Sequence, residues 1–159
     1  MANTIQIDNQ EVLDAFNRLI ASVEDMTPVM ANVAQALESE TERQFASESG
    51  PFGAWPELAP STIKERTASG TWPGKMLQRS AGGLAASVFS NYGRDFAEIG
   101  SNKPYAAIHH FGGQAGRGLK TTIPARPYFP FDPIGLTFSK ESEMTILDVF
   151  EGYLSGSLS

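Results

Sequence analysis

Apolar residues recur at helical spacing in two stretches near the start of the chain. The first stretch predicts an amphipathic helix over residues 9–25, because its apolar positions lie three or four apart: Val12, Phe16, Leu19, Ile20 and Val23. Asp8 or Asn9 can cap this helix at its N-terminus. Just before it, residues 4–8 alternate between apolar and polar side chains, which predicts a short N-terminal strand or arm.

The second stretch predicts a helix from residue 28 to about 47, the longest element of the fold. Thr27 followed by Pro28 is typical of a helix start, and the Gly-Pro-rich segment 49–53 ends it. Its apolar stripe consists of Val29, Met30, Val33, Leu37 and Phe45. Such a stripe could face a membrane surface or a coiled-coil partner. Its interruption by alanines and the acidic character of the helix favour packing on a sheet.

The middle of the chain predicts a short helix followed by a hairpin. Prolines hold residues 54–60 extended, and Ser61 can cap a helix that ends near Ala68, with Glu65 completing a weak capping box. A loop over 70–74 contains Trp72. Alternating segments at 87–92 and 96–100, joined by turn residues, predict two antiparallel strands.

The last third predicts a short helix over 105–111, a strand at 121–123 and a final helix over 137–154. Four glycines within 112–118 predict a mobile loop, so 112–122 is treated as one flexible segment. The apolar face of the final helix contains Ile146, Leu147, Phe150 and Leu154. Residues 155–159 are expected to form a frayed tail.

Composition narrows the class of protein. A length of 159 residues with 41% hydrophobic residues fits one globular domain over 1–159. The net charge of −6 argues against general nucleic-acid binding, which needs clustered Lys and Arg. Without cysteine there is no disulfide and no thiolate site. The N-terminus does not resemble a signal peptide, and no apolar run reaches the roughly 20 residues of a membrane span.

The sequence contains two candidate catalytic groups, and the evidence for catalysis by either is weak. Ser61 and Lys64 match a Ser-x-x-Lys pattern, but the companion motifs of that enzyme class are absent, and helix capping explains the serine. His109 and His110 are the two histidines of the chain. Neighbours on a helix point about 100 degrees apart and so cannot easily share a metal ion. A structural histidine is favoured, with its ring packed against other side chains and a hydrogen bond to a backbone carbonyl. No catalytic, cofactor or metal site is predicted.

The glycine-rich segment 112–118 is not a phosphate-binding loop, because the Gly-Lys-Ser/Thr ending is missing and no helix is expected after it. Arg117, Lys120 and Arg126 form a modest basic strip that could meet an acidic partner, although plain solvation is favoured. Aromatic residues in proline-rich segments either close the core edge or anchor a partner: Trp55, Trp72, Tyr128 and Phe129.

Four blocks of sequence resemble one family. They are residues 51–63, residues 75–88, the motif at 105–112 and the Ile-Pro-Ala-Arg-Pro-Tyr-Phe motif at 123–129. In this order they are similar to the phage virion morphogenesis, or tail-completion, family of Mu-like and P2-like phages. His110 stands where this family pattern leads us to expect glutamine, and the stretch before Gly83 is one residue looser.

The resemblance implies an α+β fold, with long N-terminal helices and a C-terminal helix packed on a small antiparallel sheet. It implies a structural virion protein of a tailed phage that acts at the head–tail junction, or neck, in completing and joining head and tail. A homo-oligomer, expected to be a hexameric ring, would meet connector or head-completion proteins and tail-tube or tail-terminator proteins. It would assemble in the host cytoplasm and need no cofactor, membrane or sequence-specific nucleic acid.

The same resemblance marks a set of architectural or interface residues: Trp55, Leu58, Tyr105, His109, Phe111, Gly112, Pro124, Arg126 and Pro127. Arg126 is the expected polar anchor, because a guanidinium between two prolines has a fixed direction and can pair with a carboxylate of the same chain or of a neighbour. The segment 112–122 is expected to become ordered on assembly.

Three alternatives remain open. A tail terminator or minor tail protein of similar fold would also be an assembly protein. A hydrolase would use Ser61 with Lys64, or one of the histidines. A small regulatory or toxin–antitoxin-like protein is disfavoured by the acidic charge and by the lack of a helix-turn-helix pattern.

Overall fold

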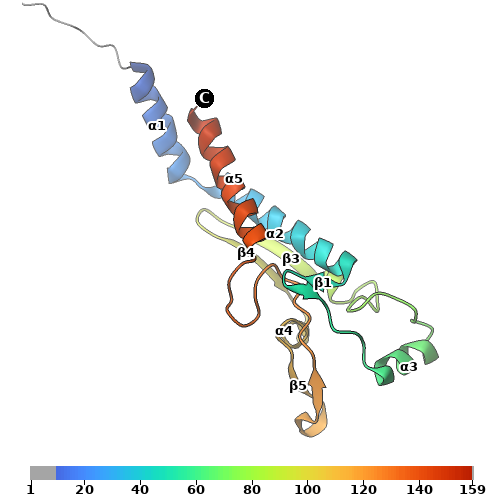
Figure 1. The fold of residues 1–159 in the computed structure, drawn as a ribbon. Coiled ribbons are helices and arrows are strands. Elements are labelled where there is room, and N and C mark those ends of the chain that lie inside the picture. The colour runs from blue at the N-terminus through green and yellow to red at the C-terminus, as the bar shows by residue number, and fades with distance from the viewer. Residues whose placement is uncertain (1–9, 159) are drawn as a thin grey trace, which may run out of the picture.

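The computed structural model describes residues 10–158, and Figure 1 shows an α+β arrangement. The helices are α1 (Gln10–Glu24), α2 (Thr27–Ser47), α3 (Pro60–Ala68), α4 (Ala106–Phe111) and α5 (Lys140–Leu158). The strands pair as antiparallel hairpins: β1 (Ser49–Gly50) with β2 (Gly53–Ala54), β3 (Val88–Tyr92) with β4 (Ala97–Ser101), and β5 (Gly113–Ala115) with β6 (Thr121–Ile123). The strand predicted at 4–8 and the caps at Asp8 or Asn9 lie outside the described residues.

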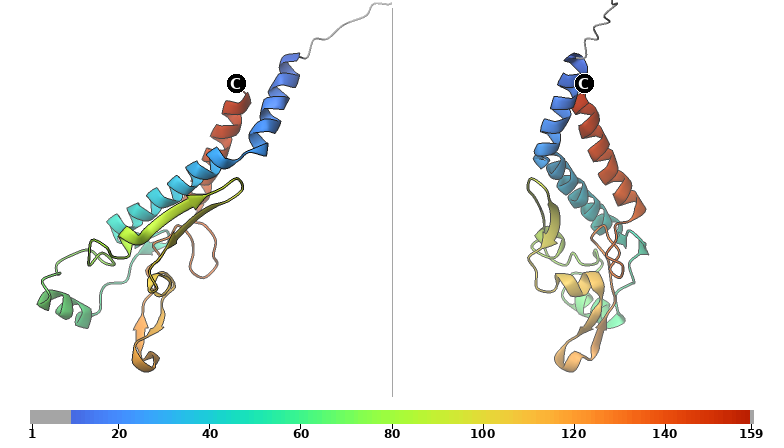
Figure 2. Two further views of the ribbon diagram at one scale, coloured as in Figure 1. Left: turned by 180° about the vertical axis from the view of Figure 1, so that it is seen from behind. Right: turned by 90° about the vertical axis from the view of Figure 1, so that its left-hand side faces the viewer.

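The molecule is elongated, with α2 as its axis (Figures 1 and 2). The β3–β4 hairpin packs along α2, and α5 packs on α2 and on α1. At one end α1 and α5 project together beyond this body, whereas α3 and the β5–β6 hairpin project from the other end. Within the described residues, none of the helices combines the length and apolar character that a membrane crossing needs.

The predicted packing of α2 on a sheet is confirmed. Val29, Val33 and Leu37 are buried and meet partly buried residues of β4 and α5. The helix begins at Thr27, but its cap differs from the expected one. The side-chain carboxylate of Asp25 accepts the Thr27 N–H at 3.0 Å. Hydrogen bonding with the Thr27 side chain, and then with its backbone N–H, lowers the pKa of Asp25. The N-cap residue is Met26, whose side chain makes no capping hydrogen bond.

A second core cluster lies beyond the C-terminal half of α2. It joins Phe45 of α2 to residues from four later segments: Trp55, Leu84, Ala106, Tyr128 and Phe129. Ile99 on β4 contacts both this cluster and the one between α2 and α5. The second cluster therefore fixes α4 and the Pro-rich segment 123–130 against the body of the protein.

The expected capping role of Ser61 is wrong. Helix α3 begins at Pro60, with Ala59 as N-cap and no side-chain capping bond. Proline at the first helical position has its φ already fixed near the helical value, so the helix starts there without help from the serine. Ser61 thus lies one residue inside the helix, with its side chain exposed.

The final helix also starts and ends later than predicted. Residues Phe131 and Phe138 form an isolated antiparallel bridge, which keeps 131–138 out of the helix. Ser139 then caps α5 by accepting the Ser142 N–H on its hydroxyl oxygen at 3.1 Å. A frayed tail was expected from residue 155. This expectation is wrong for residues 155–158, because α5 continues to Leu158.

The glycine-rich segment is a hairpin. Gly113 pairs with Ile123 and Ala115 with Thr121, around a short 3-10 turn at Arg117–Leu119. The predicted strand at 121–123 is confirmed, whereas the loop predicted over 112–118 contains a second strand, β5. The mobility expected for this segment stays a prediction. Ordering of this segment on assembly stays a prediction.

Candidate functional site

Arg126 ties the segment after β2 to the base of the β5–β6 hairpin. Its side chain is 4% exposed, and its Nε and Nη2 donate to the carbonyl oxygens of Pro56 at 2.8 Å and Glu57 at 2.7 Å. Its backbone N–H donates to the His109 carbonyl at 2.8 Å. The expectation of a carboxylate partner is therefore wrong: the guanidinium is held by backbone carbonyls, and burial lowers its pKa.

Trp55 and Pro127 add a second tie between the same segments. The Trp55 indole Nε1 donates to the Pro127 carbonyl oxygen at 2.8 Å, and the ring packs edge-on against Phe45 with centroids 5.7 Å apart. Because Trp55 is 4% exposed, this hydrogen bond satisfies a buried donor that would otherwise be costly. These residues are scaffold: they hold α4 and the extended segment 54–60 in fixed relation.

His110 belongs to the core. Its side chain is fully buried, and its Nδ1 accepts the backbone N–H groups of Tyr128 and Phe129 at 3.3 and 3.4 Å. Its ring lies edge-on to Tyr128 and Phe111, with centroids 5.2 and 4.7 Å apart. Burial lowers the pKa of His110 to about 4. This is the structural histidine that the sequence favours, although it accepts from backbone N–H groups instead of donating to a carbonyl.

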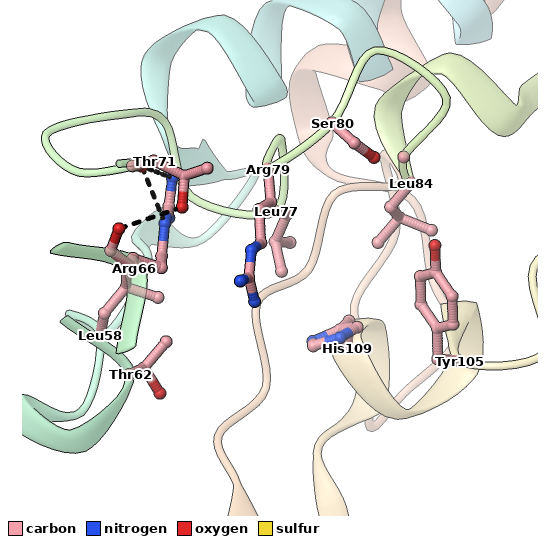
Figure 3. A pocket seen from close by; sticks show the side chains of 11 residues that line it. Leu58, Thr62, Arg66, Thr71, Leu77, Arg79, Ser80, Leu84, Tyr105 and His109 are labelled. Atoms are coloured by element: carbon pink, nitrogen blue, oxygen red, sulfur yellow. Dashed lines mark hydrogen bonds between the residues drawn. The ribbon is translucent and has the colours of Figure 1, made fainter. Parts of the chain in front are cut away.

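A cleft of about 630 Å³ opens between α3 and α4; we name it the α4 cleft (Figure 3). Tyr105 and His109 line one side of it, and Leu58 lies across from them in the segment that Arg126 holds. Leu77 and Leu84 provide further apolar wall from the loop that follows α3. Segments far apart in the sequence therefore contribute the lining. The volume of the cleft falls within the range of protein binding pockets.

Two arginines give this cleft a cationic edge. Arg66 of α3 is 4% exposed and donates to the Thr71 carbonyl oxygen at 3.0 and 3.2 Å and to the Lys75 carbonyl oxygen at 3.1 Å. Arg79 is about half exposed and pairs with Glu65 at 2.8 Å. An exposed pair of this kind contributes little to stability, so Arg79 is available to other carboxylates.

The α4 cleft contains His109, one of the two histidines considered as candidate catalytic groups. Desolvation and the nearby Arg126 lower the pKa of His109, so its ring is neutral at pH 7. Within the described residues, its Nδ1 has no hydrogen-bond partner and no hydroxyl is bonded to it. Ser61 and Lys64 are exposed on α3. In the described part of the chain, no three His, Cys, Asp or Glu side chains are grouped to hold a metal ion.

The residues marked by the resemblance fall into three places. Leu58, Tyr105 and His109 line the α4 cleft. Trp55, Arg126 and Pro127 form the scaffold behind it. The remaining three lie where α4 meets the β5–β6 hairpin: Phe111, Gly112 and Pro124.

Gly112 has a backbone conformation that other residues rarely adopt. Its φ is +72° and its ψ 178°, and a Cβ atom there would lie 2.8 Å from the Ala125 nitrogen. The turn from α4 into β5 therefore requires glycine at this position.

The sequence missed two features of the site. The predicted basic strip does not form, because Arg126 is buried whereas Arg117 and Lys120 lie on the exposed turn of the β5–β6 hairpin. Arg66 and Arg79 were not singled out, since nothing local to the sequence distinguishes them from other surface cations. Their roles depend on how the loop 69–84 folds back over α3.

Comparison with known proteins places the chain in a family. The sequence model of the phage virion morphogenesis family matches residues 7–155. The chain belongs to this family. It is 35% identical to the protein named Mu-like prophage FluMu G protein 2 of Haemophilus influenzae, over 94% of each chain. It is 36% identical to a protein of Escherichia phage Mu whose name describes a proposed capsid assembly protein G, over 79% of this chain and 78% of the relative.

A further relative, named Mu-like prophage FluMu G protein 1, is 33% identical over 83% of this chain and 86% of its own length. No solved structure matches the chain significantly. The family and these relatives support a structural role in phage assembly, as the resemblance in the four sequence blocks implied.

Proposed function

We propose that this protein is a non-enzymatic subunit of the phage neck, where it completes the tail or the head so that the two can join. It acts as a ring of identical subunits, with six copies matching the symmetry of the tail. Its partners are connector or head-completion proteins on one side and tail-tube or tail-terminator proteins on the other. Assembly takes place in the host cytoplasm, and the protein then belongs to the virion.

The observation that carries this proposal is the apolar surface left open by the fold. Phe16 and Ile20 of α1 are 58% and 56% exposed, and Leu147 of α5 is 58% exposed. Phe16 and Ile20 lie on α1, which projects from the body (Figure 2), whereas Leu147 lies on α5 next to residues that pack on α2. Grouped apolar side chains on a projecting element are typical of a protein–protein interface. A chain of this shape is therefore suited to work as one part of a larger assembly.

A second candidate function is capsid assembly before the neck forms. The name of the phage Mu relative favours it, since that name describes a capsid assembly protein. The same open surfaces would then contact head proteins. Placement at the neck and a role in head formation differ in the particle that accumulates when the protein is missing.

Deletion of the gene from an inducible phage separates the two functions. Electron microscopy of the lysate should show DNA-filled heads and full-length tails that are not joined, and wild-type protein supplied from a plasmid should restore complete phage. Absent or malformed heads in the deletion lysate would favour capsid assembly and would refute the neck proposal.

The hydrolase alternative is tested in the same phage. A double Ser61→Ala and Lys64→Ala variant should restore complete particles as well as wild type does, because both side chains lie exposed on α3. Loss of particles with a variant that still folds would instead support catalysis by this pair.

A further inference from the structure

Charge is divided unevenly along the chain. Residues 58–130 carry nine Lys and Arg side chains and three Asp and Glu, a net charge of +6. The flanking segments 1–57 and 131–159 together carry three Lys and Arg side chains and fifteen Asp and Glu, a net charge of −12. In the fold, the basic middle forms α3, the α4 cleft and the β5–β6 hairpin, whereas α1 and α5 come from the acidic flanks. The two ends of the molecule therefore carry opposite charge.

The acidic end presents an apolar surface that we name the α1 face. It consists of side chains between 46% and 58% exposed: Val12, Leu13, Phe16, Ile20 and Val23. Helix α5 covers only the adjoining side of α1, where Ala15, Leu19 and Ser22 are partly buried. Val12 and Phe16 border a shallow hollow together with Glu11. The α1 helix has three acidic residues and one arginine.

The basic end presents the α4 cleft, whose character complements the α1 face. Its wall is apolar at Leu58, Leu77 and Leu84, and Tyr105 is 42% exposed at its edge. From Leu58 to Leu84 the chain has four Lys and Arg residues and one glutamate. An amphipathic acidic helix is the kind of element that such a groove accepts, with apolar side chains inside and carboxylates toward the cationic edge.

One molecule cannot bring these two surfaces together. Helix α1 lies beyond one end of α2, whereas α3, which borders the α4 cleft, lies beyond the other end (Figures 1 and 2). The 21 residues of α2 span about 30 Å. A contact between them must therefore join two copies. Because the two surfaces differ, the contact is heterologous. It repeats from copy to copy and forms a ring when the rotation between neighbouring copies closes.

We propose that the α1 face of one copy docks in the α4 cleft of the next, so that identical subunits join head to tail. Phe16 and its apolar neighbours contact the leucine wall and Tyr105, and the acidic side chains of α1 lie near Arg79. This inference rests on the proposed function in one respect, because that function requires a ring of identical subunits. It names the two surfaces that make the ring.

A complementation experiment with two variants tests the docking. Phe16→Asp places a charge on the α1 face, and Tyr105→Asp places one at the edge of the α4 cleft. Both positions are exposed, and Tyr105 is the N-cap of α4, where aspartate is well tolerated. Ile134→Asp is the matched control, because Ile134 is an apolar side chain 93% exposed on the loop before α5. Circular dichroism checks that every variant folds.

Sedimentation velocity then gives the mass of each protein alone and in mixture. Wild type and Ile134→Asp should associate with rising concentration, and more weakly at high salt. Each of the other two variants should associate at least about tenfold more weakly, as expected for loss of one central interface residue. An equal mixture of Phe16→Asp and Tyr105→Asp should form a 1:1 dimer, because one intact cleft meets one intact α1 face.

Three results in solution would overturn the proposal. One is a mixture that stays monomeric. Another is association lost in Phe16→Asp but kept in Tyr105→Asp, which would indicate α1 pairing with α1 in a symmetric dimer. The third is wild type that remains monomeric at about 1 mM. In the phage, complete particles formed by Tyr105→Asp would refute this docking and leave the neck function standing, since that function is judged by the deletion alone.

Discussion

Replacement of His110 by glutamine is expected to remove about 2 kcal/mol of the loss of folding stability between pH 7.5 and 5. His110 is fully buried, and its Nδ1 accepts two backbone N–H groups. Protonation would turn this acceptor into a donor facing two donors, in a site closed to water. Burial accordingly lowers the pKa of His110 to about 4, against about 6.5 in an unfolded chain.

The size of the effect follows from these two values. Below pH 6.5 the unfolded chain takes up a proton at this position, whereas the folded protein does so only near pH 4. The stability contributed by neutral His110 is therefore complete above about pH 7 and declines as the pH falls toward 4. Between pH 7.5 and 5 the decline amounts to about 2 kcal/mol, a sizeable part of a typical folding free energy of about 5–15 kcal/mol.

Urea unfolding followed by circular dichroism measures this decline. With a slope of about 2 kcal/mol per molar urea, wild type should lose about 1 M in its unfolding midpoint between pH 7.5 and 5. Glutamine can accept the N–H groups of Tyr128 and Phe129 with its side-chain oxygen and does not titrate. The His110→Gln midpoint should therefore fall much less over the same interval.

The companion variant His109→Gln separates the two histidines. Desolvation and Arg126 also lower the pKa of His109, so this change removes a contribution of the same sign. The contribution of about 2 kcal/mol from His110 must nevertheless persist in it. If the His110→Gln midpoint falls with pH as far as that of wild type, the assignment of the pH dependence to this buried ring is wrong.

Three further substitutions test the scaffold by urea unfolding at pH 7.5. Arg126→Lys should cost about 2 kcal/mol, because an ammonium cannot reproduce both hydrogen bonds of the guanidinium; an unchanged midpoint would contradict the bidentate role. Gly112→Ala should cost about 2–3 kcal/mol through its φ of +72°, whereas Gly82→Ala, with open space around it, should be nearly neutral; equal effects would refute the strain. Trp55→Phe should cost about 1–2 kcal/mol by leaving the Pro127 carbonyl unpaired, and no loss would show that the bond is dispensable.

The elements that were predicted well from the sequence are those whose apolar and turn residues lie within a short stretch of chain. Helix α2 and the β3–β4 hairpin carry their apolar periodicity and turn residues within a few positions, and both formed where predicted. Helix ends were less accurate, because several residues compete to start a helix. Pro60 began α3 in place of Ser61, and Ser139 capped α5 after a bridge that pairs Phe131 with Phe138.

The β5–β6 hairpin was missed for a different reason. Its strands have three residues each, and most of their side chains are exposed. Without a buried face there is no apolar alternation to detect, so the glycines alone suggested a loop. The α4 cleft could not be predicted from sequence patterns for a third reason. Its lining residues come from segments that are far apart in the sequence and meet only in the folded protein. Leu58 and Tyr105 were singled out through the family resemblance alone, whereas His109 was also considered as a candidate catalytic histidine.

The residues shared with the family pattern now divide by what their loss should do. Trp55 and Arg126 are buried and bonded to backbone carbonyls, so their replacement lowers stability and affects assembly only through folding. Leu58 and Tyr105 border an open cleft, and within residues 10–158 their side chains make no hydrogen bond to another segment, so their replacement can leave folding intact. If the cleft is an assembly surface, the two groups must separate in experiment: stability changes for the first pair, and self-association changes at constant stability for the second. A cleft variant that loses both would show instead that this surface is part of the fold.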